Sequence, residues 1–94
     1  MVIWKYKVAP DMVNQVYSLP KGAEILSFGA DGANQLCFWA LVNEQAPHED
    51  RVLACVGTGW PLVTLEGDKE KTIDFIGSVT QDTYVWHLFE IVND

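Results

Sequence analysis

Hydrophobic and polar positions alternate over short stretches of this chain, which is the period of a β-strand. Residues 2–8 (VIWKYKV) place aromatic side chains on one face and lysines on the other, the pattern of a half-buried strand. Residues 36–42 (LCFWALV) are apolar on both faces, which predicts a strand in the middle of a sheet. At most one short helix is expected.

Residues that favour turns separate the other predicted strands. We expect strands at residues 23–28, 51–56, 72–79 and 84–92, with a short edge strand at 62–65. Residues 13–19 (VNQVYSL) fit a strand or a short helix, and their β-branched and aromatic side chains favour the strand. Turns are predicted at 20–22, 29–32, 57–61 and 81–82, with Asp31-Gly32 the strongest hairpin signal, and polar loops at 43–50 and 66–71.

This spacing of strands and turns predicts an all-β protein. Six to eight short strands with frequent turns are typical of a small antiparallel sandwich or a partly open barrel. The length of 94 residues predicts a single globular domain over 1–94. A hydrophobic fraction of 49% supports a filled core and excludes a disordered chain.

The net charge of −7 is concentrated in the second part of the chain. Residues 31–94 hold three cations against eleven carboxylates, a balance of −8. Binding to a phosphate backbone requires clustered Lys and Arg, so no direct contact with nucleic acid is expected. The acidity fits either a solubilising surface or a face that docks on a basic protein surface.

The positions of the two cysteines and the lengths of the apolar runs allow predictions about metal binding and the cellular compartment. Cys37 and Cys55 lie in apolar runs without a C-x-x-C pair, so no zinc site is expected. A disulfide between them would require neighbouring strands. No signal-peptide pattern or membrane-length apolar run is present, and we expect a cytoplasmic protein with no membrane association.

The segment at 57–61 (GTGWP) is the strongest candidate for a binding site. Gly57 and Gly59 permit a sharp turn and a close approach, and the amides around Thr58 are suited to an anion. Trp60 is suited to stacking on a planar ligand, and Arg51 offers a cationic fork. The alternative is an ordinary glycine turn covered by a packed tryptophan.

His87 is the remaining candidate, in the last predicted strand. It fits a hydrogen-bonded histidine of the core or an interface better than a catalytic base, because no nucleophile can be assigned to it. His48, Glu49 and Asp50 form a polar cluster whose spacing matches no metal site. No catalytic residue, metal or cofactor is therefore expected, and we predict a protein that is not an enzyme.

Several segments together resemble a known family. They are residues 4–6 (WKY), 19–27 (LPKGAEILS), 36–42, 49–51 (EDR), 57–59 (GTG), 76–77 (IG) and 85–90 (VWHLFE). In this combination the chain resembles a family of small proteins of unknown function found mainly in bacteriophages and prophages. The family pattern has His-Pro after G-T-G, where this chain has Trp60-Pro61. The resemblance implies an origin and transfers no residue role.

A phage origin implies a binding protein that acts in the host cytoplasm. We expect a counter-defence inhibitor, which either sequesters a nucleotide immune signal or blocks a host defence protein, and which forms a homo-oligomer. The candidate ligand-binding residues are Arg51, Gly57, Thr58, Gly59, Trp60 and His87. The alternatives are a virion or assembly component and a small nucleotide-cleaving enzyme.

Overall fold

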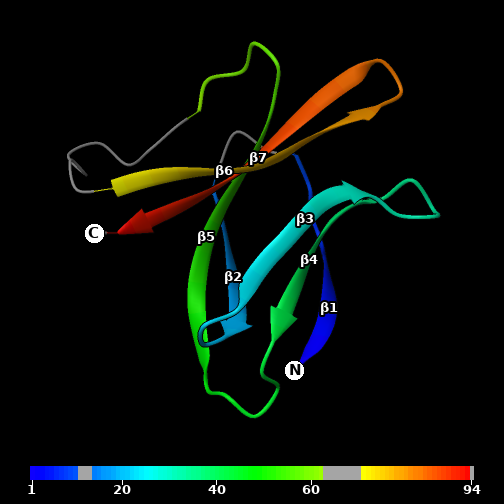
Figure 1. Cartoon of the computed structure of the whole chain (residues 1–94). Helices are drawn as coiled ribbons and strands as arrows, with labels where there is room; N and C mark the ends of the chain where they lie inside the picture. Colours follow the sequence, from blue (N-terminus) through cyan, green and yellow to red (C-terminus); the bar gives the residue numbers. More distant parts are fainter. Residues whose placement is uncertain (11–13, 63–70, 94) are drawn as a thin grey trace.

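The computed structural model describes residues 1–10, 14–62 and 71–93, and every element in this part of the chain is a strand. The strands are β1 (Val2–Lys7), β2 (Gln15–Pro20), β3 (Glu24–Ala30), β4 (Leu36–Val42), β5 (His48–Gly57), β6 (Lys71–Gln81) and β7 (Tyr84–Asn93). They form two antiparallel sheets, three-stranded in the order β1-β4-β3 and four-stranded in the order β2-β5-β7-β6 (Figure 1). The predicted all-β class is confirmed.

The core lies between the two sheets. In the three-stranded sheet, Phe38 is fully buried on β4 and its ring stacks on Tyr6, with centroids 4.9 Å apart. Leu53 and Leu88 face it from the four-stranded sheet. β4 lies between β1 and β3, which confirms the central strand predicted from its run of apolar residues. Two side chain-to-backbone bonds join β2 to the end of β1 and the residues after it: Tyr17 Oη donates to the Lys7 carbonyl at 2.9 Å, and Gln15 Nε2 donates to that of Ala9 at 2.8 Å.

The four-stranded sheet is also apolar on the face directed away from the core, here called the outer face. The register places Ala54 opposite Phe89 and Val56 opposite His87 on this face. Ala54, Val56 and Ile91 are buried, yet none of them belongs to the core cluster. Phe75 lies opposite Phe89 on the edge strand β6 and is 61% exposed. A sheet that is apolar on both faces is usually covered on both.

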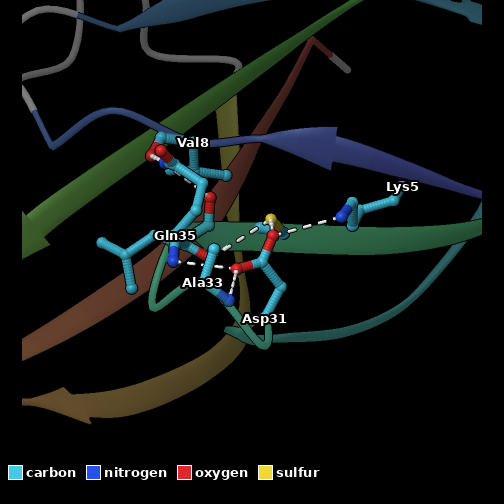
Figure 2. Close-up of polar contacts among 7 residues, drawn as sticks. Lys5, Val8, Asp31, Ala33 and Gln35 are labelled. Carbon is cyan, nitrogen blue, oxygen red and sulfur yellow. Dashed lines mark hydrogen bonds and ion pairs between the residues drawn. The ribbon is translucent and has the colours of Figure 1, made fainter.

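The β3–β4 connection is fixed by Asp31, as Figure 2 shows. Its carboxylate accepts backbone N–H bonds from Ala33 and Gln35 at 2.9 and 3.0 Å, and Lys5 Nζ lies 3.1 Å away. These contacts, of which the bond from Gln35 is the largest, lower the pKa of Asp31 to about 2. The turn predicted at 29–32 is wrong in its first half, because Gly29 and Ala30 pair with β4 as the end of β3. The connection begins at Asp31 and extends to residue 35, because the aspartate organises the following residues.

Several predicted boundaries differ from the structure. The expected loop at 43–50 is wrong in its second half, because β5 begins at His48 and residues 48–50 pair with β2. The last turn lies at residues 82–83 rather than 81–82, with Asp82 at a φ of 56°. Residues 13–19 form a strand where they are described, from Gln15 onward. The edge strand and loop expected at 62–71 lie mostly outside the described residues, whereas Leu62 is in no strand and Lys71 begins β6.

The cysteines lie in different sheets and are both free thiols. Cys37 on β4 pairs with Lys7 and Gly29, whereas Cys55 on β5 pairs with Leu88. Burial raises the pKa of Cys55 to about 12 and also raises that of Cys37. Both therefore act as small buried side chains rather than as reactive thiolates.

Candidate functional site

A row of three hydrogen-bonded polar side chains lies on the outer face, near the β6–β7 turn. Ser78 Oγ is 2.7 Å from His87 Nδ1, and Thr58 Oγ1 is 2.7 Å from His87 Nε2. Ser78 lies directly opposite His87 on β6, while Thr58 follows β5 two residues after Val56, the partner of His87 on that strand. Both ring nitrogens of His87 therefore contact a hydroxyl, and both hydroxyls belong to exposed residues.

The predicted turn after β5 positions Thr58. Trp60 N–H donates to the Gly57 carbonyl at 3.0 Å, and Gly59 has a φ of 90°, which together define a type II turn with glycine at its third residue. The amide of Thr58 donates to the Val85 carbonyl at 3.1 Å. This hydrogen bond attaches the turn to β7 beside His87. It also fixes the backbone position from which the Thr58 side chain extends.

Aromatic rings pack behind this turn. The rings of Trp60 and Trp86 meet edge to face with centroids 5.2 Å apart, and Tyr84 stacks on Trp86 at 5.4 Å. Trp86 Nε1 donates to Gln81 Oε1 at 3.1 Å. A Cβ atom on Gly57 would lie 3.1 Å from the ring of Trp86 and 3.2 Å from that of Trp60. Gly57 is therefore required for ring packing, while Trp60 remains 38% exposed.

Arg51 lies at the opposite end of β5 from this turn. Gly57 is six residue steps further along the strand, or about 20 Å at 3.3 Å per residue. Its guanidinium donates to both carboxylate oxygens of Glu90 and, through Nη1, to the Ala23 carbonyl at 2.9 Å. The bond to Glu90 raises the pKa of Arg51. The structure brings five of the six predicted residues to one end of the sheet. Arg51 lies apart from them, and its guanidinium is hydrogen-bonded to Glu90 and the Ala23 carbonyl.

An acidic cleft opens where β5 and β7 diverge. Their pairing ends at Val52 opposite Ile91, and Figure 1 shows β5 and the β6–β7 hairpin crossing at a steep angle. The cleft has a volume of about 390 Å³ and is lined by Glu49, Asp50, Arg51, Val52, Glu90, Ile91 and Val92. The lining includes three carboxylates and one guanidinium, which is hydrogen-bonded to Glu90 and lies 3.9 Å from Glu49. Two valines and an isoleucine form the apolar part of the wall.

The sequence predictions did not include Ser78 or Glu90. The predicted turn at 81–82 would place Ile76 opposite His87, whereas the turn at 82–83 pairs His87 with Ser78. Glu90 had a usable signal, because it is a carboxylate within the apolar final strand and requires a partner there. Arg51 supplies that partner from the adjacent strand.

The described residues contain neither a cluster of metal ligands nor a helix that could span a membrane. No three His, Cys, Asp or Glu side chains among them come close enough together to hold a metal ion. Within the same part of the chain there is no helix with the length and hydrophobicity needed to cross a bilayer.

These features define a small two-sheet antiparallel β protein with an acidic cleft and a hydroxyl–imidazole row on one sheet. The model of a family described as a domain of unknown function (DUF7352) matches residues 1–94. The chain therefore belongs to that family. No curated protein and no solved structure matches it.

Proposed function

We propose that this chain is a phage-encoded counter-defence protein that binds a host defence protein and blocks a basic surface on it. The acidic cleft between β5 and β7 carries the proposal, because three carboxylates line it with a single guanidinium, which already contacts Glu90 and Glu49. A cleft of this charge attracts Lys and Arg side chains of a partner and accelerates their encounter. The phage origin rests on the sequence resemblance described above.

The apolar outer face beside the cleft supplies the second part of such an interface. Phe75 is 61% exposed, Val16 63% and Ile73 42%. Large apolar side chains grouped on one face of a small protein usually mark an interaction site, and interfaces combine an apolar centre with a polar rim. The partner surface is accordingly basic and partly apolar.

The arrangement of cations favours a protein partner over a nucleotide. Lys5 is paired with Asp31, and Arg51 is paired with Glu90. The other cationic side chains that the structure describes are Lys7 on β1 and Lys21 in the β2–β3 turn. Neither belongs to the turn at residues 57–60. Sequestration of a nucleotide phosphate needs cations or several amides at the site, so the protein-blocking form of counter-defence is the better supported.

The proposal is tested by phage plaquing on bacteria that carry individual defence systems, with and without expression of this chain. We expect the chain to restore plaquing against a defence system, and Asp50→Lys to remove that effect. Glu24→Lys makes the same charge change on the other sheet and should retain it, because Glu24 is exposed on β3. Equal loss in both variants would argue against a role for the cleft.

Native mass spectrometry of the chain purified from the same cells separates the two forms of counter-defence. A complex with a subunit of the defence system that dissociates at high salt is the expected result, since exposed charge pairs are screened. A retained mass of nucleotide size, with no protein partner, would contradict the proposal in favour of nucleotide sequestration.

A further inference from the structure

The row formed by Ser78, His87 and Thr58 contains a hydroxyl that is paired with a base. A neutral imidazole has one N–H group and one bare nitrogen, whereas a hydroxyl can donate or accept. Because both nitrogens of His87 lie 2.7 Å from a hydroxyl, one hydroxyl donates its proton to the bare nitrogen and the other accepts the N–H. A nucleophile, a base and a group that orients the base are the components of hydroxyl-based acyl transfer.

We propose that Ser78 is the nucleophile of an acyl-transfer site, with His87 as its general base and Thr58 as the positioning residue. Ser78 carries a primary hydroxyl, whereas the hydroxyl of Thr58 is hindered by its methyl group. Thr58 is also held by its backbone bond to Val85 within the type II turn, which suits a fixed acceptor for His87 Nε2–H. This activity would be additional to the binding function proposed above and does not depend on it.

The local backbone supports the assignment to Ser78. The bulge between Phe75 and Gly77 immediately precedes it, and bulges next to reactive sites redirect side chains. On the outer face, the partly exposed Phe89 lies two residues from His87 on β7, and the buried Val56 lies opposite His87 on β5. The substrate class that fits is therefore an ester or thioester with a short apolar acyl group.

The reaction balances without any further cofactor. Ser78 Oγ attacks the acyl carbon while its proton moves to His87 Nδ1. Collapse of the tetrahedral intermediate breaks the bond to the alcohol or thiol, which leaves with the proton from Nδ1. Water then attacks the acyl-Ser78 ester by the same route and regenerates the hydroxyl.

The chain contains its own comparison pair. Ser18 Oγ lies 3.1 Å from His48 Nδ1 at the other end of the same face, and no second side chain among the described residues bonds His48. Ser18 is exposed like Ser78. If proximity to any histidine were sufficient, both serines would react equally, whereas an oriented base favours Ser78 alone.

The test is incubation of the full chain with p-nitrophenyl butyrate, following p-nitrophenol release and mapping the butyryl group by peptide mass spectrometry. We expect acylation of Ser78 and not of Ser18. His87→Gln should slow acylation by about 100-fold or more, the usual contribution of a general base. Thr58→Val should slow it about tenfold and Thr58→Ser should restore the rate, because serine keeps the accepting oxygen.

The controls separate reactivity from folding. Ser78→Ala and Ser18→Ala alter exposed residues, so both variants should remain folded, with a small decrease of the unfolding midpoint that is larger for Ser78→Ala because it removes the shorter hydrogen bond. Only the first should lose the butyryl group. Acylation confined to lysines or the amino terminus, at a rate unchanged by Ser78→Ala, would overturn the proposal. Equal labelling of Ser18 and Ser78, or labelling of Thr58 instead of Ser78, would also overturn it.

Discussion

The two ends of the four-stranded sheet each carry a serine–histidine pair on the outer face, but their surroundings differ. Near the β6–β7 turn, His87 is held between two hydroxyls at 2.7 Å. At the other end, His48 meets Ser18 alone, at 3.1 Å, and both residues are exposed. The residue types are the same, so the difference lies in the backbone that presents them.

The charged groups are distributed in the opposite way. The end with the loosely held pair contains the Arg51–Glu90 ion pair, whose side chains are only 18% and 13% exposed. The end with the tightly held row relies on a glycine turn and packed tryptophan rings. One end is therefore stabilised by paired charge and the other by packing and neutral hydrogen bonds, and substitutions should reveal this contrast.

The largest effect is expected at the charged end, from Glu90→Gln. This change removes the carboxylate that accepts two hydrogen bonds from the mostly buried Arg51 guanidinium and leaves only Glu49, 3.9 Å away. Loss of one partner of a buried pair costs about 3–5 kcal/mol. Because this pair is not fully buried, we expect the lower limit, about 3 kcal/mol of unfolding free energy, measured by urea denaturation. Glu24→Gln, on an exposed residue, should change it by less than about 0.5 kcal/mol.

A double variant distinguishes loss of attraction from an unpaired charge. Arg51→Met with Glu90→Leu removes both charges and keeps apolar volume, so it should be less harmful than Glu90→Gln alone. If the double variant is the more destabilised, the ion pair itself supplies the stability of this end.

The next effect is expected at the packed end, from Gly57→Ala. The added Cβ would lie 3.1 Å from the ring of Trp86, and overpacking of this kind costs about 1–3 kcal/mol. The tryptophan fluorescence should change with it, because Trp60 and Trp86 must separate. Gly32→Ala is the matched control, since no atom lies within 4 Å of a Cβ built there. Equal stability of the two variants would show that the rings adjust freely.

The strand pattern was predictable because alternation and apolar runs are local properties. The strands at 2–8 and 36–42 and the final hairpin follow from period and turn residues alone. The start of β5 did not follow, because His48, Glu49 and Asp50 are polar and resemble a loop. They form a strand since their backbone pairs with β2 and their side chains face solvent or the cleft.

The candidate site was partly predictable for a related reason. Thr58 and His87 were named because glycines and a histidine stand out in a sequence. Ser78 required the position of the β6–β7 turn, because moving the turn by one residue, to 81–82, would place Ile76 instead of Ser78 opposite His87. The separation of Arg51 from the turn required strand geometry, since nearness along an extended strand does not bring side chains together. The assignment of strands to two sheets is a long-range property that local patterns do not contain.

The smallest effect concerns the two serine–histidine pairs themselves. Thr58→Val removes the hydroxyl that contacts His87 Nε2, and a net hydrogen bond contributes about 0.5–1.5 kcal/mol. Because Thr58 is exposed and water can replace its hydroxyl, we expect a loss near 0.5–1 kcal/mol of unfolding free energy. Ser18→Ala should cost less, since the 3.1 Å contact to His48 is the longer one and holds an exposed ring.

Urea denaturation of the two variants in parallel measures the difference. Equal losses would mean that the double contact does not hold His87 more firmly than the single contact holds His48, and the contrast between the ends would then rest on charge and packing alone.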